Sequence, residues 1–163
     1  MSKRKPNKSA RSRRGKAKDY KAKQRLKAQK DAVLRGAIER NACTLKLRLG
    51  HPDSNNPSDY IDIEAIIDTG ATNCAIRKDI ADRLNLPVVD TQGVQGINGV
   101  VHAPVVIMTM VVEDKGTVAG RQIRATVLDQ MADPMLFGME GMMGGVLKVD
   151  TIRGTWEWRI KGL

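Results

Sequence analysis

The 163-residue chain has little of what disulfide-rich, metal-binding or membrane-spanning proteins need: two Cys, two His, two Trp, two Tyr and one Phe. Cys43 and Cys74 are too few for a disulfide framework, which favours reduced thiols in a cytoplasmic protein. His51 and His102 have no partners at metal-ligand spacing, so we predict neither a metal nor another cofactor. No run of 18 apolar residues is present, and we therefore expect no transmembrane segment.

The positive charge of the chain lies almost entirely at its N-terminus. Residues 1–40 carry 16 Lys and Arg residues against three acidic residues, a net charge of +13. The remaining 123 residues carry 12 basic and 15 acidic residues, a net charge of −3, and they are enough for one domain with a real core. The chain is therefore predicted to be a globular domain, residues 42–163, behind a basic extension, residues 1–41.

Two kinds of segment make up the basic extension. Residues 1–19 are a low-complexity mixture of Lys, Arg and Ser with almost nothing to bury, so we expect them to be disordered. Residues 20–41 are rich in Ala, Lys, Gln, Arg and Leu, which are good helix formers. Their apolar residues follow three- and four-residue spacings, which predicts a helix over 20–41 with one narrow apolar face.

Beyond residue 42, apolar and polar residues alternate with the period of a β-strand. Strands are predicted at 43–49, 60–67, 105–112, 121–128, 146–152 and 155–160. A short helix is predicted over 77–84 and a helical turn near 139–143. Many short strands with Gly-rich turns predict an all-β barrel or sandwich, and the lack of long alternating helices argues against a parallel α/β fold.

The segment 66–72, Ile-Ile-Asp-Thr-Gly-Ala-Thr, places an acidic residue directly after an apolar strand. A carboxylate in such a desolvated place needs either a proton or a partner, which makes Asp68 the candidate catalytic residue. Gly70 permits a backbone conformation that a side chain would forbid. A purely local interpretation remains open, in which Asp68 ends the strand with an Asx turn.

The surroundings of Asp68 resemble the active-site loop of retropepsin-like aspartic proteases, the family of the retroviral proteases and their cellular relatives. The family shows two apolar residues, Asp, Thr or Ser, Gly, Ala, and Thr or Ser. It then has a short helix, a Gly-rich flap hairpin matched by residues 93–101, and an apolar strand ending near Gly, matched by 135–140. Glu140 stands where the family usually has Asp or Asn, and Met139 replaces the Arg of the viral enzymes. The resemblance covers about residues 43–160.

This resemblance implies a closed β-barrel of the retropepsin type with a short C-terminal helical turn. It implies an aspartic endopeptidase that acts on a polypeptide substrate. Asp68 would be catalytic, Thr69 would brace the loop, and the backbone at Gly70 and Ala71 would approach substrate. The flap would include Gly96, Ile97, Asn98 and Gly99, and Asn98-Gly99 predicts its tight turn.

The number of catalytic carboxylates predicts the assembly. The reaction needs two aspartates, whereas the sequence holds one Asp-Thr-Gly, because Asp150-Thr151 is followed by Ile152. A twofold homodimer would supply the second Asp68 and place the site on its axis.

Two other functions stay open at this point. One is a catalytically inert, protease-like dimer used for binding, although an intact Asp-Thr-Gly-Ala argues against it. The other is a nucleic-acid-associated protein that acts through residues 1–41, whose charge could also bind another anionic surface. With Tyr20 as its one aromatic residue, the extension would bind without sequence preference.

Overall fold

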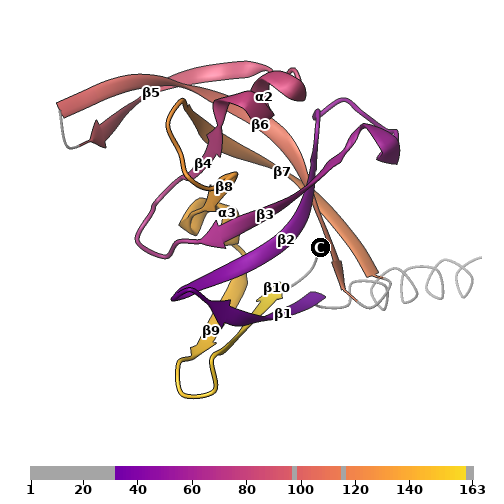
Figure 1. Cartoon of the computed structure of the whole chain (residues 1–163). Coiled ribbons are helices and arrows are strands. Elements are labelled where there is room, and N and C mark those ends of the chain that lie inside the picture. The colour runs from indigo at the N-terminus through magenta and orange to yellow at the C-terminus, as the bar shows by residue number, and fades with distance from the viewer. Residues whose placement is uncertain (1–31, 97–98, 115–116, 161–163) are drawn as a thin grey trace, which may run out of the picture.

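The structure, a computed structural model, describes residues 32–96, 99–114 and 117–160 (Figure 1). Its strands and helices are β1 (Ala32–Glu39), β2 (Ala42–Gly50), η1 (Pro57–Asp59), β3 (Ile61–Ile67), β4 (Cys74–Arg77), α2 (Lys78–Arg83), β5 (Val88–Gly96), β6 (Gly99–Asp114), β7 (Thr117–Leu128), β8 (Met135–Phe137), α3 (Met139–Met142), β9 (Gly145–Asp150) and β10 (Thr155–Ile160). None of the described helices is long and apolar enough to cross a membrane.

Most of the strands close into a barrel. The pairing order is β6-β7-β4-β8-β3-β2, and a further pairing of β2 with β6 completes the ring. Most neighbours are antiparallel, whereas β3 with β8 and β4 with β7 run parallel. The all-β barrel prediction is therefore confirmed, as are the short helix near 77–84 and the helical turn near 139–143.

Apolar side chains at every second position of the strands fill the interior of the barrel. In β2, Leu45, Leu47 and Leu49 are buried while Lys46 is exposed, because successive side chains of a strand point to opposite faces. The centre of the core is formed by fully buried aliphatic and Met side chains from several strands: Leu49, Ile76, Met108, Met110 and Met135. Few aromatics are needed because these flexible and branched side chains fill the narrow interior.

The predicted helix over 20–41 is wrong for residues 32–39, which form β1 and pair with β10 along six residues. Residues 20–31 lie outside the described residues. Ala32 and Leu34 are buried in the core, whereas Arg35 is exposed, which is the alternation of a strand. Pairing with a strand more than a hundred residues away overrides the local helix propensity. Residues 32–39, which were assigned to the extension by the predicted boundary between 41 and 42, therefore form a strand that contributes to the core.

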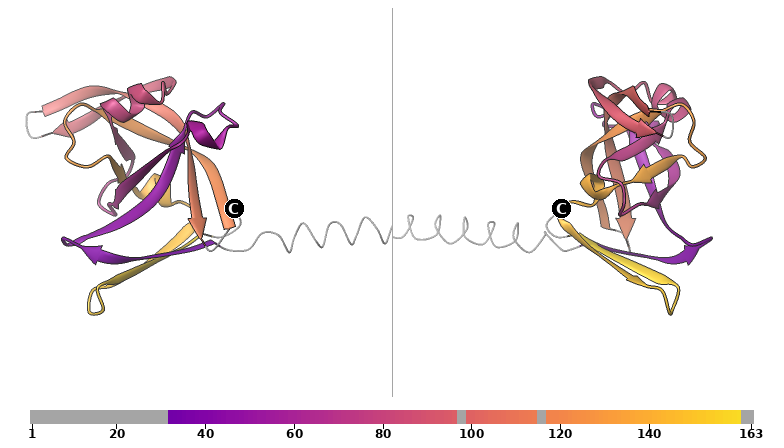
Figure 2. Two further views of the ribbon diagram at one scale, coloured as in Figure 1. Left: turned by 45° about the vertical axis from the view of Figure 1, so that its right-hand side comes forward. Right: turned by 90° about the vertical axis from the view of Figure 1, so that its left-hand side faces the viewer.

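The strands β1, β10 and β9 form a separate layer beneath the barrel (Figure 2). Trp156 and Trp158 of β10 point from this layer into the core and are buried. A Cβ atom on Gly36 would lie 2.6 Å from the Trp156 ring, so the absence of a side chain there lets the two strands pack. Trp158 also makes an edge contact with Phe137, at a centroid distance of 5.3 Å, and so joins the layer to the barrel.

The β5–β6 hairpin projects from the opposite end of the molecule (Figure 1). Gly96 pairs with Gly99, so Gly99 is a strand residue and not part of the turn predicted at Asn98-Gly99. Its φ of +110° is a conformation that glycine adopts without strain. Ile97 and Asn98, which were predicted for the flap, lie outside the described residues.

Candidate active site

Asp68 begins the loop that joins β3 to β4, directly after the buried Ile67. Its backbone N–H donates to the Phe137 carbonyl at 3.1 Å, which ties the end of β3 to β8. Its Oδ1 accepts a hydrogen bond from the Gly70 N–H at 2.9 Å. This is the contact that the local Asx-turn interpretation predicts. The carboxylate is half-buried, so the turn holds it in place without removing it from the surface.

The segment from Gly138 through α3 supports the active-site loop from behind. The N–H of Met139 donates to the Ala71 carbonyl at 2.8 Å, and the N–H of Glu140 donates to the Thr72 carbonyl at 2.9 Å. A Cβ on Gly138 would collide with the Asn73 backbone carbonyl. These contacts fix the backbone on both sides of Asp68, which is the preorganisation that a catalytic carboxylate requires.

The predicted loop residues occupy different environments. Thr69 and Gly70 are exposed, and Ala71 is half-buried. Among the described residues the Thr69 hydroxyl makes no hydrogen bond within the chain, so its bracing role stays a prediction. The loop therefore presents Thr69 and Gly70 on the surface beside Asp68.

Cys74 and Arg121 lie near each other behind the loop, and the sequence placed Arg121 in a strand, 121–128, without a role at the site. Burial raises the pKa of the Cys74 thiol, while hydrogen bonds from the backbone of Gly138 and Gly141 act in the opposite direction. Burial lowers the pKa of Arg121, whose Nη1 donates to the Met143 carbonyl at 2.7 Å. Its Nε and Nη2 are buried without a hydrogen-bond partner among the described residues. The Asp-Thr-Gly motif by itself does not indicate that Arg121 lies nearby.

A small pocket lies between the active-site loop and the base of the β5–β6 hairpin. Its volume is about 140 Å³. It is lined by Asn73, Asp90, Gln92, Val105, Arg124, Ala125, Thr126 and Glu140. An ion pair joins Arg124 Nη2 to Asp90 Oδ2 at 2.8 Å. The pKa of Asp90 is lowered first by the Thr91 N–H and then by this arginine. Sequence reasoning missed the pocket because its residues come from five separate segments.

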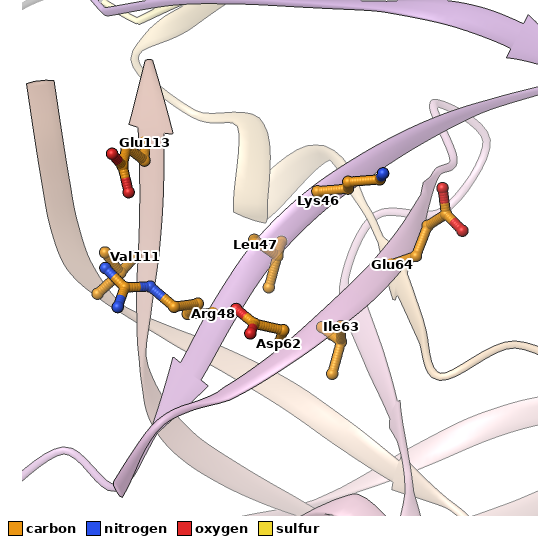
Figure 3. A pocket seen from close by; sticks show the side chains of 8 residues that line it. All are labelled: Lys46, Leu47, Arg48, Asp62, Ile63, Glu64, Val111 and Glu113. Carbon is orange, nitrogen blue, oxygen red and sulfur yellow. The ribbon is translucent and has the colours of Figure 1, made fainter. Parts of the chain in front are cut away.

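A larger hollow of about 600 Å³ lies on the outer face of β2, β3 and β6 (Figure 3). It is lined by Lys46, Leu47, Arg48, Asp62, Ile63, Glu64, Val111 and Glu113. Lys46 lies opposite Glu64, and Arg48 lies opposite Asp62, in the β2–β3 pairing. Opposite charges on neighbouring strands stabilise a solvated sheet face. The hollow contains none of the loop residues 68–73, so we do not assign the active site to it.

Within the described part of the chain, no group of three or more His, Cys, Asp or Glu side chains is placed to hold a metal ion. The arrangement can instead support acid–base chemistry at Asp68, in a loop whose backbone is fixed and whose front surface is open.

Comparison with known proteins agrees with this geometry. Residues 59–142, more than half of the chain, match the family model described as "gag-polyprotein putative aspartyl protease". The chain belongs to this aspartyl protease family. The match begins just before β3 and ends with α3, so it contains the Asp68 loop, the β5–β6 hairpin and the supporting segment around Gly138.

The crystal structure of a retropepsin-like aspartic protease from Rickettsia conorii is similar in fold to this family member, with a TM-score of 0.58 and 18% sequence identity. The alignment covers 82% of this chain and 94% of that chain. The comparison with curated proteins gave no match. The fold is therefore that of the retropepsin-like aspartic proteases, as the resemblance in sequence predicted.

Proposed function

We propose that this protein is an aspartic endopeptidase whose active site forms when two copies each contribute Asp68. The observation that carries the proposal is the position of the single Asp-Thr-Gly. It follows the buried end of β3, a strand of a retropepsin-type barrel, and backbone hydrogen bonds hold it from both sides. A catalytic carboxylate needs this combination of fixed backbone and accessible side chain.

The proposed reaction uses one water molecule and no covalent intermediate. Two carboxylates held about 3 Å apart cannot both ionise, so the pair shares one proton. The ionised carboxylate takes a proton from water, whose oxygen attacks the scissile carbonyl carbon. The protonated carboxylate gives its proton to the carbonyl oxygen. The tetrahedral species then collapses: the C–N bond breaks, and the leaving nitrogen receives a proton from one carboxyl group. One hydroxyl of the tetrahedral species gives its proton to the other carboxylate as the C=O bond re-forms, which leaves the pair with one proton again.

The surface near the loop supports the proposed homodimer. Exposed large apolar side chains occur in the segment that begins beside Ala71 and continues to the turn after β9: Met139, Met143, Val146 and Ile152. In the described sheet β9 is a terminal strand, with β10 as its one neighbour, so one row of its backbone groups is open for pairing. A second copy that covers this surface would bring a second Asp68 loop toward the first.

The decisive variant is Asp68→Asn. It keeps the side-chain volume and an oxygen that can accept from Gly70, but it cannot act as the base. We expect peptide cleavage to fall by at least about 10²- to 10⁴-fold while the dimer stays folded. Products from a peptide library would be read by mass spectrometry. Asp62→Asn is the matched control, because Asp62 lies exposed on the outer face of β3, the strand that leads to Asp68. Unchanged turnover in the Asp68→Asn chain would refute the proposal.

Dilution distinguishes a dimeric enzyme from a monomeric enzyme and from an inert dimer. The specific activity of the wild-type chain should fall as the dimer dissociates. An inert binding dimer would show assembly without turnover at any concentration. Full activity in a sample shown by sedimentation to be monomeric would rule out a site shared by two copies.

A further inference from the structure

The small pocket beside the active-site loop holds a carboxylate without a partner. The Glu140 side chain lines the pocket and makes neither a hydrogen bond nor an ion pair with any described residue. Its backbone N–H is engaged, since it donates to the Thr72 carbonyl. The position of Glu140 is therefore set by the same contacts that fix the active-site loop, while its charged group stays available.

The other walls of the pocket are polar and come from the β5–β6–β7 sheet. Asp90 pairs with Val105, and Val105 pairs with Thr126; Gln92 and Arg124 occupy alternate positions of the same strands. Strand alternation therefore places these polar side chains on one face of the sheet. Asn73 closes the pocket from the loop that carries Asp68.

The charges in the pocket do not cancel. Arg124 is neutralised by its ion pair with Asp90. Among the residues that line the pocket, Glu140 then carries the one negative charge without an ion-pair partner. The amides of Asn73 and Gln92 add acceptors and donors. Such a site attracts a cationic donor, repels a carboxylate, and would leave Glu140 desolvated without a partner if an apolar group entered.

We propose that this pocket binds a positively charged side chain, Lys or Arg, of the polypeptide substrate and that Glu140 is the specificity-determining residue. The inference rests on the proposed function, since it assigns a preference to the same active site. A volume of about 140 Å³ suits one side chain. The pocket adjoins the loop that carries Asp68, through Asn73, and the base of the β5–β6 hairpin, through Asp90 and Gln92, and this proximity is the reason for assigning it to the bound peptide.

The cleavage experiment compares basic and neutral peptides with the full-length dimer. Peptides identified from a library are remade with Lys, Gln or Glu at each position in turn. At one position Lys should raise kcat/KM over Gln by about tenfold, the effect of a charge-assisted hydrogen bond at a partly exposed site, and Glu should lower it. Glu140→Gln should abolish this preference, and Glu140→Lys should reverse it toward Glu. Glu113→Gln, in the outer hollow, should leave the preference as it is in the wild type.

A binding experiment makes the result independent of catalysis. Titration calorimetry with the full-length Asp68→Asn chain should show about tenfold tighter binding of the Lys peptides than of the matched Gln peptides. That difference should be lost in the Asp68→Asn, Glu140→Gln chain. Binding that depends on Glu140 without cleavage by the wild type would support the pocket and refute the peptidase. Cleavage or binding with no position sensitive to Glu140 would overturn the pocket and leave the peptidase standing. Thermal unfolding of each variant confirms that it is folded.

Discussion

Two hairpins of this protein, β5–β6 and β9–β10, expose similar apolar side chains but have different support. In the β5–β6 hairpin, no described side chain between 88 and 95 or between 99 and 102 is buried, and Val88, Val89, Val100 and Val101 are open to solvent. In the β9–β10 hairpin, one face carries buried residues of β10: Trp156, Trp158 and Ile160.

This difference separates a hairpin that can move from one that cannot. The outer part of the β5–β6 hairpin, which has no buried side chain among the described residues, opens at little cost in free energy. The β9–β10 hairpin is anchored by two buried tryptophans and opens only with the core. The first suits a flap that closes over substrate, and the second suits a fixed platform for a second copy. Substitutions in each hairpin, and a truncation outside both, should therefore affect stability, assembly and turnover differently.

Removing the anchor of the C-terminal hairpin should have the largest effect on stability. Trp158 is fully buried and packs edge-on against Phe137, whose carbonyl holds the Asp68 N–H. Trp158→Ala should lower the free energy of unfolding by about 3–5 kcal/mol, because it leaves a large cavity. Chemical denaturation measures the loss. A Trp158→Ala chain as stable as the wild type would show that this hairpin is not anchored as described.

A charge on the exposed side of the same hairpin should break assembly and spare folding. Val146 of β9 is 49% exposed in the single chain and pairs with Arg159, on the face of the hairpin away from the two tryptophans. Val146→Lys would place like charges near each other across a twofold interface, so the dimer should weaken by at least about tenfold with little change in monomer stability. Analytical ultracentrifugation across a dilution series provides the measurement. Val149→Thr is the control on the other face of β9, and an unchanged dimer in Val146→Lys would move the interface elsewhere.

Substitutions in the β5–β6 hairpin should reduce turnover and leave the stability of the protein nearly unchanged. Val101→Ser changes a side chain that is 64% exposed, so the free energy of unfolding should stay within about 0.5 kcal/mol of the wild type. If Val101 contacts bound peptide, kcat/KM should fall several-fold. Asn98→Pro should likewise reduce turnover more than stability. Loss of stability without loss of turnover in these variants would mean that the hairpin is structural and not a gate.

The basic extension should have the smallest effect on catalysis. We expect it to bind RNA or DNA without sequence preference, with an affinity that falls steeply as salt rises. The structure changes the truncation that tests this, because a chain beginning at residue 42 would lack β1. A chain of residues 32–163 should keep the protease fold and lose the binding. Equal binding by both chains, or binding by neither at low salt, would reject this role and leave the peptidase untouched.

Local patterns were enough to predict much of this protein. Strand alternation, a Gly-containing hairpin and an aspartate after two isoleucines are features of near neighbours in the chain, so the sequence located β2, β3, β6 and β7 of the barrel, the projecting hairpin and the Asp68 loop. Strand alternation did not predict β4, whose four residues are too few to show a pattern. The family match over residues 59–142 covers the same features. Gly99, predicted for the turn of this hairpin, pairs with Gly96 as a strand residue, and Ile97 and Asn98 lie outside the described residues.

What only the tertiary structure decided depends on residues that are distant in the chain. Residues 32–39 have helix-forming composition, yet they form a strand because β10 offers backbone partners and Trp156 packs over Gly36. The support of the Asp68 loop by Gly138, Met139 and Glu140 arises because the parallel pairing of β3 with β8 brings these segments together. The sequence by itself determined which residue is the candidate for the chemistry, since that depends on the chemical identity of a side chain and its immediate neighbours. Its surroundings, including the unpartnered Glu140 in the polar pocket, were decided by non-local pairing, which no single stretch of sequence encodes.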